Sequence, residues 1–317
     1  MKRPIFMPVV VAMLVAACGV GGPDVSPTAT TGLSTTVPAT TEPSADPATT
    51  TAPGPSTTTS PDPASTVPAP DLAISAWYLI DEAGQEGRPG PFLVPVSRGI
   101  SYTSATAAAA MRALIGGPTV DESAAAPPLS SMIPEGSRFH DVSVEGGMAT
   151  VDVDAAFGLA DHSAAAAVRV AQVVFTLTQF PTIREVRFLE DGSPVDVQTS
   201  QGDLVGRPVN RADYRDLQAI VSVDKPAYGG PGANPLRVTG EAAVFEATFA
   251  YALTDKDGSI LAEGHAMTAE GNTWAPFDFT IEYVVDEPQP GALIVWVDSA
   301  KDGSPVNVRE YPLKLQP

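Results

Sequence analysis

The sequence is poor in the side chains that most often carry chemistry. Its 317 residues include one cysteine and three histidines. A single cysteine excludes an internal disulfide framework, a zinc site built on several thiolates and an iron–sulfur cluster. The few histidines leave little material for a metal site or for general-base catalysis. Composition therefore favours a protein with neither an enzymatic activity nor a cofactor.

Basic residues are also scarce. The chain has 18 Lys and Arg against 37 Asp and Glu, which gives a formal net charge of −19. Nucleic-acid binding needs clustered basic side chains, so this balance argues against a nucleic-acid partner. Hydrophobic residues make up 44% of the chain, which is enough to bury a core. The length allows about two domains of roughly 100–200 residues each.

The N-terminus has the layout of a secretory signal peptide. Two basic residues precede an apolar run from Ile5 to Ala17, which is shorter than the roughly 20 residues that a membrane-spanning helix needs. The only cysteine, Cys18, follows Val15-Ala16-Ala17, and this motif resembles the lipobox of bacterial lipoproteins. The resemblance implies removal of residues 1–17 and lipidation of Cys18, which would anchor the protein at the extracytoplasmic face of the cell membrane. The alternative is an ordinary signal peptide with an incidental cysteine.

Residues 18–71 form the predicted linker. Positions 23–70 contain 11 Pro and 20 Ser or Thr, together with acidic residues and no basic ones. Such a segment cannot bury enough apolar surface to offset the entropy that ordering would cost, so we expect it to be disordered. It would serve as a stalk that holds the folded domains away from the membrane, or simply as a spacer.

Residues 72–217 mix strand and helix patterns and predict an α+β domain. Apolar segments at 73–80 and 92–96 indicate strands, and alternation on both sides of residues 145–147 indicates a hairpin. Residues 106–115 predict a helix that is ended by the following Gly-Gly-Pro.

Residues 163–180 predict a second helix with an apolar stripe of Val170, Val173, Val174 and Leu177. Arg169, Gln172 and Thr176 lie opposite this stripe. We therefore expect these three side chains to be exposed, and they form the candidate binding surface of the domain.

Residues 218–317 predict an all-β domain. Apolar and polar residues alternate through about seven short segments, and Asp257-Gly258 and Asp302-Gly303 mark hairpin turns. This pattern is typical of an immunoglobulin-like sandwich, here without the inter-sheet cysteines of antibody domains. The boundary falls near Gln218, where the mixed pattern gives way to strands alone.

Several motifs follow one another through the first domain: Trp77-Tyr78, Leu93–Arg98, Leu114–Pro118, Met132–Ser137, Val174–Phe180, Val186–Phe188, Asp191-Gly192 and Arg211–Tyr214. With these motifs in this order, residues 72–217 resemble the GerMN domain, which is named for sporulation and spore germination proteins. Residues 219–315 resemble the immunoglobulin-like domain of bacterial spore germination proteins through Ile220–Pro226, Val238–Ala242, Val244–Glu246, Asp255–Gly258 and Ser299–Gly303. The resemblance implies an envelope lipoprotein of a family without an established enzymatic activity or cofactor. It also implies that the first domain is similar in fold to modules that assemble rings in the envelope.

Two short acidic motifs have a chemical and a structural interpretation. Asp255-Lys256-Asp257-Gly258-Ser259 begins like a calcium loop, but Ala266 stands where an EF-hand needs its bidentate Glu, and a hairpin turn explains the motif better. Asp161-His162-Ser163 contains the residue types of a hydrolytic triad, yet triads are assembled in space, and capping of the following helix is the better interpretation.

The remaining candidates are a carboxylate pair and a set of aromatic residues. Asp152 and Asp154 are predicted on one face of a strand and would suit a glycosidase, although acidic residues on a solvated face are ordinary. Trp77, Tyr78, Trp274 and Trp296 could stack on sugars if exposed. We expect Trp296 to lie in the core, and Trp274 has the sequence context of an exposed ring.

These observations predict a multidomain protein with an α+β GerMN-type domain and an all-β immunoglobulin-like sandwich, preceded by a disordered linker. We expect a non-enzymatic, lipid-anchored binding or assembly module in the cell envelope. Its partners would be envelope proteins or cell-wall glycan, with the membrane reached through the lipid anchor. The alternatives are an envelope-acting hydrolase and a solute-binding lipoprotein; the latter predicts two helix-rich lobes.

Overall fold

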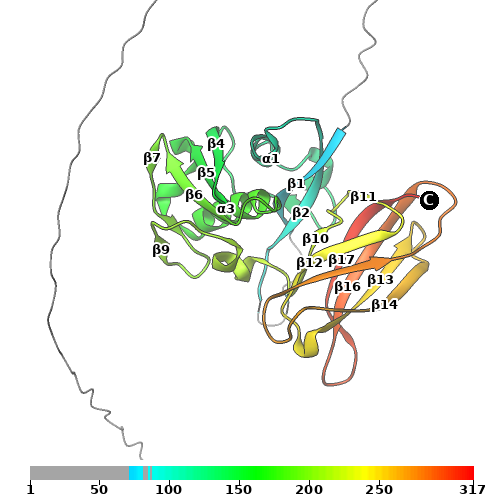
Figure 1. Cartoon of the computed structure of the whole chain (residues 1–317). Coiled ribbons are helices and arrows are strands. Elements are labelled where there is room, and N and C mark those ends of the chain that lie inside the picture. Colours follow the sequence, from blue (N-terminus) through cyan, green and yellow to red (C-terminus); the bar gives the residue numbers. More distant parts are fainter. Residues whose placement is uncertain (1–70, 81–84, 86–87) are drawn as a thin grey trace, which may run out of the picture. The chain divides into compact units, whose positions relative to one another are not determined.

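The structure is a computed structural model that describes residues 71–80, 85 and 88–317. The predicted signal peptide, Cys18 and all but the last residue of the predicted linker lie outside the described residues. Two parts of the described chain correspond to the predicted domains (Figure 1). Both fall within one compact unit of the chain, and the exact boundary between them stays a prediction.

The first domain contains an antiparallel sheet with the strand order β2-β1-β3. β1 (Asp71–Ile80) pairs with β2 (Phe92–Ser101) along its whole length, and the short β3 (Leu129–Ser130) pairs only with Leu79 and Ile80 on the other side. Side chains from Ala76 to Ile80 are all buried, on both faces of the strand. This double burial explains why the sequence there is a continuous apolar run instead of an alternating one.

A four-stranded sheet follows, with the order β4-β5-β6-β7. Its strands are β4 (Phe139–Glu145), β5 (Met148–Val153), β6 (Glu185–Glu190) and β7 (Ser193–Pro194). β4 and β5 form the predicted hairpin, and β5 and β6 run parallel. Alternate residues of β5 are buried, whereas Val144 of β4 is exposed, so β5 supplies most of the buried face of this hairpin. β8 (Val197–Gln198) and β9 (Leu204–Val205) form a separate pair.

Two α-helices of the described part of the first domain are ten residues or longer, as predicted. α1 (Thr106–Ile115) has the predicted bounds, and α3 (Ala164–Leu177) ends three residues before the predicted Phe180. The shorter helices are α2 (Val120–Ser123) and the 3-10 helices η1 (Ala155–Phe157), η2 (Leu159–Asp161) and η3 (Arg211–Leu217). α3 links the parallel strands β5 and β6 and is buried on nearly all sides.

The second domain consists of two facing sheets with the orders β10-β12-β15 and β11-β17-β16-β13-β14. The strands are β10 (Val221–Lys225), β11 (Pro231–Gly232), β12 (Leu236–Ala242), β13 (Thr248–Asp255), β14 (Ile260–Met267), β15 (Ala275–Ile281), β16 (Gln289–Asp298) and β17 (Pro305–Leu315), with the 3-10 turn η4 (Phe245–Ala247) between β12 and β13. Phe249 of β13 and Phe277 of β15 join the two sheets, with ring centroids 4.8 Å apart. Alternate residues of β12 are buried, as a sandwich requires.

The predicted fold class, an α+β domain followed by an all-β sandwich, is confirmed. Among residues 71–80, 85 and 88–317, we find no helix with the length and apolar character needed to cross a bilayer.

Candidate functional site

The three side chains predicted as an exposed binding surface are buried, so the prediction of their exposure is wrong. The exposed fractions of Arg169, Gln172 and Thr176 are 8%, 0% and 0%. The helical pattern could not reveal this because α3 packs on both its apolar and its polar side. These residues are part of the interior, and a partner cannot reach them without unfolding the domain.

The polar side of α3 completes the edge of β1. β3 pairs with only two residues of β1, which leaves the backbone of Ser75 and Trp77 without a strand partner on that side. Thr176 Oγ1 accepts from the Trp77 N–H at 3.0 Å, and Gln172 Nε2 donates to the Trp77 carbonyl at 3.0 Å. Gln179 bonds both backbone groups of Ser75, at 2.8 and 2.6 Å. Two side chains of α3 and one just beyond its end thus take the place of a neighbouring strand.

Arg169 holds the start of the same helix. Its guanidinium donates to the carbonyls of Met132 and Gly158 at 2.9 and 2.6 Å, and it pairs with Asp161 at 2.8 Å. Asp161 also accepts from the hydroxyl and the N–H of Ser163. The Ser163 hydroxyl bond, followed by the Arg169 bond, lowers the pKa of Asp161 to about 2. Ser163 itself caps α3 by accepting from the Ala166 N–H at 3.1 Å, which confirms the capping interpretation.

The other acidic candidates also serve local backbone structure. Asp152 accepts from the Gly192 N–H at 2.9 Å, and Asp154, just beyond the end of β5, accepts from the Arg138 N–H at 3.0 Å. Asp255 accepts from two backbone N–H groups of the turn between β13 and β14, which confirms the hairpin interpretation of that motif. In the described part of the chain, no group of three or more His, Cys, Asp or Glu side chains is placed to hold a metal ion.

The aromatic candidates do not form an exposed platform. Trp77 and Tyr78 are buried, and the Tyr78 hydroxyl donates to the carbonyls of Ala113 and Gly117. Trp274, expected to be exposed, is half-buried with the guanidinium carbons of Arg88 and Arg215 at 5.3 and 4.8 Å from its ring. Trp296, expected in the core, is also half-buried, and its indole donates to Asp298 at 3.0 Å.

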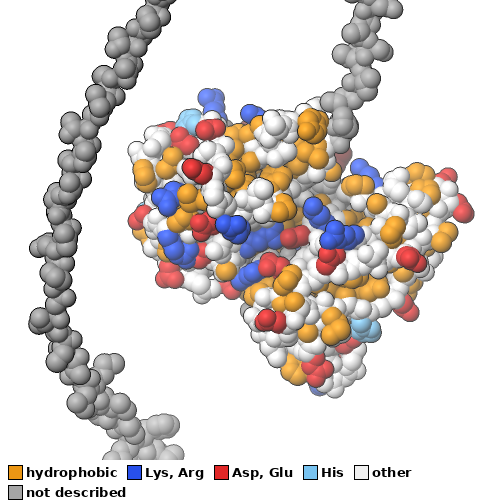
Figure 2. All heavy atoms as spheres, viewed as in Figure 1, with side chains coloured by type: hydrophobic (Ala, Val, Ile, Leu, Met, Phe, Trp, Pro, Cys, Tyr) orange, Lys and Arg blue, Asp and Glu red, His pale blue; other side chains and the backbone are white. Residues whose placement is uncertain are grey.

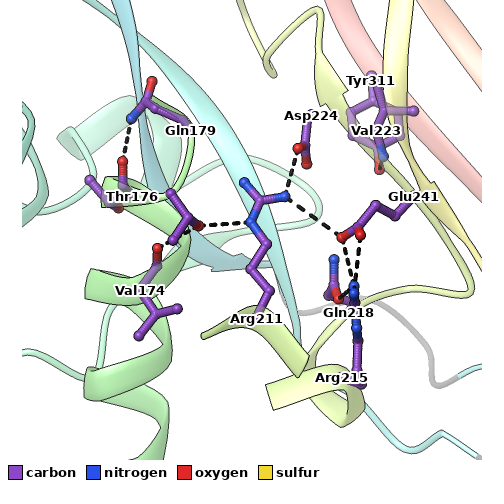
Figure 3. A network of polar contacts seen from close by, with 11 residues as sticks. Val174, Thr176, Gln179, Arg211, Arg215, Gln218, Val223, Asp224, Glu241 and Tyr311 are labelled. Atoms are coloured by element: carbon purple, nitrogen blue, oxygen red, sulfur yellow. Dashed lines mark hydrogen bonds and ion pairs between the residues drawn. The ribbon is translucent and has the colours of Figure 1, made fainter. Parts of the chain in front are cut away.

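The densest group of charged side chains lies where the first domain meets the second, and we take it as the candidate functional site (Figure 3). At its centre is Arg211, the first residue of η3. Its Nε donates to Thr178 Oγ1 at 2.9 Å, and its Nη1 pairs with Asp224 at 2.6 Å and with Glu241 at 3.9 Å. Thr178 follows α3, whereas Asp224 and Glu241 belong to β10 and β12. One guanidinium therefore connects elements of both domains.

Aromatic rings hold the Arg211 guanidinium from the first domain. Its central carbon lies 5.1 Å from the Trp77 ring centroid and 4.9 Å from that of Phe175, and the two rings pack with centroids 5.0 Å apart. Cation–π contacts of this kind are strongest where water is excluded, and the Arg211 side chain is only 12% exposed. The first domain thus supplies contacts of its own that position the Arg211 guanidinium.

Arg215, one helical turn after Arg211, forms a second connection. It binds the Glu241 carboxylate through both terminal nitrogens, at 2.6 and 3.0 Å, and donates to Gln218 Oε1 at 2.7 Å. Its guanidinium also stacks near Trp274 of the second domain. This bidentate geometry fixes the direction as well as the distance of the contact between Arg215 and Glu241.

The two carboxylates of this network have opposite pKa shifts. Burial raises the pKa of Asp224 above its ordinary value, and the nearby Arg211 only partly offsets this effect. Burial also acts to raise the pKa of Glu241, but the hydrogen bonds and charge of Arg215, with a contribution from Arg211, outweigh it and lower that pKa below 4.5. Glu241 is therefore the firmly ionised member of the pair.

The lowered pKa of Glu241 predicts a contribution to acid unfolding. The unfolded chain binds this proton more readily than the folded one, so the stabilisation is complete above pH 4.5 and is lost as pH falls through the lower folded pKa. Glu241→Gln should lower the free energy of unfolding at pH 7 and flatten its decline between pH 5 and 3, measured by urea denaturation of the full-length protein. Glu263→Gln is the control, because Glu263 is exposed on β14 and should leave both quantities unchanged. An unaltered pH profile for the Glu241 variant would contradict this role.

A pocket of about 320 Å³ opens beside the network, and residues of both domains line it. Its wall includes Ser75, Trp77, Arg211, Asp224, Lys225 and Thr239. Figure 2 shows basic side chains grouped over the middle of the face in view, with acidic ones beside them. This grouping contrasts with the strongly acidic composition of the whole chain.

Sequence patterns did not identify this site. The expected role of Arg211 was limited to a family motif, and Asp224 and Glu241 were seen only as parts of strand motifs. A usable signal was the density of basic residues after residue 206, since five of the 18 Lys and Arg occur between Arg207 and Arg237. Side chains from two domains converge only through tertiary structure, so their pairing is not visible along the chain.

Comparisons with known proteins agree with this architecture. Residues 76–196 match the family described as sporulation and spore germination, and residues 220–304 match the family described as the immunoglobulin-like domain of bacterial spore germination. The two matched ranges together cover more than half of the chain. The chain therefore contains a domain of the first family followed by a domain of the second.

Solved structures give two further comparisons. The chain is similar to the tandem GerMN domains of the sporulation protein GerM from Bacillus subtilis, with 17% identity over 45% of this chain and 47% of that chain and a TM-score of 0.34. It is also similar to the first GerMN domain of the same protein, with 19% identity, coverage of 39% of this chain and 86% of that chain, and a TM-score of 0.28. The chain thus spans about half the length of the tandem structure. A comparison with curated proteins finds no match.

Proposed function

We propose that the protein is a lipid-anchored, extracytoplasmic module that binds or assembles envelope components and catalyses no reaction. The observation that carries this proposal is the Arg211–Arg215 network, which commits the densest charged group of the described chain to joining two domains. A composite surface made of two fixed domains suits binding. The lipobox-like motif before Cys18 and the Ser/Thr/Pro-rich linker support a location outside the membrane surface.

The structural roles of the catalytic candidates also support a binding role. Asp152, Asp154 and Asp161 each accept backbone or cap hydrogen bonds, and the Asp161 carboxylate is turned toward Arg169. A hydrolase would need such groups free to meet substrate. The solute-binding alternative expects a second helix-rich lobe, and residues 218–317 contain strands with a single 3-10 turn.

Anchoring can be tested at Cys18. We expect Cys18→Ser to move the protein from the detergent-rich phase to the aqueous phase when cells are extracted with a phase-separating detergent, because the acyl chains can no longer be attached. Metabolic labelling with a clickable fatty acid should mark the wild type and leave the variant unlabelled. Ser34→Ala, in the linker, is a control that should partition like the wild type. Acyl label retained on the Cys18 variant would refute lipidation at this residue.

The partner can be sought by crosslinking the full-length protein in native membranes. Recovered proteins or glycans that are lost when Arg215→Ala weakens the connection between the domains would support a composite binding surface. Partners recovered equally from wild type and variant would place binding on one domain alone. Turnover of peptidoglycan or a glycoside by the purified protein, abolished by Asp152→Asn, would overturn the non-enzymatic proposal.

A further inference from the structure

The five-stranded sheet of the second domain ends in a strand with an open edge, β14 (Figure 1). One side of β14 bonds β13, and among the described residues no backbone hydrogen bond from any other element reaches residues 260–267. Every second side chain from Glu263 to Met267 is exposed. An edge of this kind presents a row of N–H and C=O groups that can pair with a strand of another chain.

Three other edge strands carry features that block such pairing. β4 has a bulge between Phe139 and Asp141, β15 contains Pro276, and the outer edge of β2 is bonded by the backbone of Tyr228. β14 contains no proline, lysine or arginine, and its residues 262–267 pair with β13 without a bulge. Natural sheets use bulges, prolines, charged side chains and covering segments to protect their edges, so β14 lacks most of the usual protection.

The sequence of β14 is complementary to itself. When two copies pair antiparallel about a twofold axis at Gly264, Glu263 of each copy stands opposite His265 of the other. Both side chains are exposed, because they alternate with Ala262, Gly264 and Ala266 on the core side of the strand. An imidazole N–H can donate to a carboxylate directly across a strand pair, and such cross-strand contacts stabilise the pairing. The twofold symmetry supplies this contact twice.

Neighbouring registers lack this complementarity. A shift of one residue would turn the exposed side chains to the core side, so only shifts of two residues keep the faces matched. One such shift places Glu263 opposite Glu263 of the other copy, where like charges destabilise the pair. The opposite shift places His265 opposite His265 and Glu263 opposite Met267. The pairing centred on Gly264 is therefore the favoured one.

Two further features favour a second copy as the occupant of this edge. A Cβ at Gly264 would lie 2.9 Å from the Tyr251 hydroxyl, so the Tyr251 ring covers this glycine on the core side. An aromatic ring over a glycine stabilises an edge strand, here at the point where the twofold axis would pass. The linker of the same chain suits the edge poorly, because residues 23–70 include 11 prolines, which cannot donate to a strand ladder.

We propose that the protein forms a homodimer through β14, in which the five-stranded sheets of two copies join into one continuous sheet with Gly264 at the twofold axis. Met267 is 69% exposed at the end of the strand, and the other copy would cover part of it. A single strand pair buries little area, so the dimer should be weak and should dissociate at the sub-micromolar concentrations of spectroscopic unfolding experiments. Glu263 therefore does not contribute to stability measured there. The inference goes beyond the proposed envelope role and needs no lipid anchor.

Cysteine crosslinking of the full-length protein in native membranes tests the register. When Glu263→Cys and His265→Cys chains are co-expressed and mildly oxidised, we expect a disulfide between the two variants, because opposite residues of a strand pair have the Cα separation that a disulfide needs. Each variant alone should crosslink to itself about tenfold less, since its two copies are offset by two positions, beyond the roughly 7 Å limit. Thr280→Cys, exposed on the edge strand β15, is the control for random collision.

A charge exchange tests the contact itself. The association of the purified full-length protein is measured by sedimentation equilibrium in a density-matched detergent. His265→Glu should weaken association about tenfold, because it places carboxylates opposite each other at two symmetric positions. Adding Glu263→Lys restores opposite charges and should return association to within about threefold of the wild type. Both variants lose the contact of His265 with Asp298 at 3.4 Å, so recovery reports the cross-strand contact alone.

Several outcomes would overturn the dimer. The substituted positions are exposed, so the variants should fold, and unchanged melting temperatures will verify this. Crosslinking between the Glu263 and His265 variants no stronger than that of Thr280→Cys would reject the pairing, and so would equal crosslinking of either variant to itself. Failure of the charge exchange to restore association would reject the contact. Attachment of a different envelope protein to the Glu263→Cys chain, in place of a second copy, would assign the edge to another partner. None of these outcomes bears on the Cys18 anchoring test, so the two proposals fail separately.

Discussion

Arg211→Met should lower the free energy of unfolding of the full-length protein by about 3–5 kcal/mol, because it leaves a buried carboxylate without its cation. The variant removes the ion pair with Asp224, the bond to Thr178 and the contacts with two aromatic rings. Urea denaturation at pH 7 is the measurement. The loss should shrink as pH is lowered, because Asp224 already has a raised pKa and takes up a proton readily.

The matched control for this variant is Arg237→Met. Arg237 also binds a carboxylate through two bonds, but it and Asp278 are 70% and 52% exposed, so the loss should stay below about 1 kcal/mol. Asp224→Asn combined with Arg211→Met should recover part of the stability, since the uncompensated charge is gone. Similar losses in the Arg211 and Arg237 variants would show that burial of the network contributes nothing.

Gln172→Ala should lower the free energy of unfolding by about 2–4 kcal/mol, although the residue is polar and lies opposite the apolar stripe of its helix. Its amide bonds the Trp77 carbonyl and the Met132 N–H at 3.0 and 2.9 Å, and both groups would lose a partner in a dry interior. Gln172→Met keeps most of the volume and so separates the loss of hydrogen bonds from the loss of packing.

The control for Gln172 is Gln201→Ala. Gln201 is exposed and reaches only Asp216, so its removal should change stability by less than about 0.5 kcal/mol. If Gln172→Ala proved equally mild, the side-chain replacement for a strand partner along β1 would be unimportant to stability. In either case the measurement decides between a structural and a surface role for the polar side of α3.

The sequence predicted those parts of the fold that depend on local patterns. The bounds of α1 follow from its apolar spacing and the glycines after it, and the sandwich follows from period-two alternation that is clearest in β12. α3 was found but its polar side was misjudged, because a helical pattern does not distinguish solvent from the unpaired edge of a strand. Gln172 and Thr176 illustrate this, since a polar side chain can hydrogen-bond either to water or to the backbone of an unpaired strand.

The charged site at the junction of the two domains could not be predicted from the sequence, for a different reason. Arg211 and Arg215 are contributed by η3, and their carboxylates by strands β10 and β12. Nothing in either stretch alone shows that the other is near, and an arginine between domains has the same sequence appearance as one in solvent.

The division of charges in the network also limits how these modules can be recombined. The segment that ends the first domain carries both arginines, and the second domain carries both acids. Each domain alone would therefore hold charged side chains without their ion-pair partners. A sandwich grafted from another protein would fit behind this first domain only if it presented acids at the positions of Asp224 and Glu241. A neutral residue at the position of Asp224 would leave the Arg211 guanidinium against Trp77 and Phe175 without its nearest carboxylate, and one at the position of Glu241 would leave Arg215 without its bidentate partner. Exchange of domains between such proteins is therefore restricted to partners that carry the complementary pair.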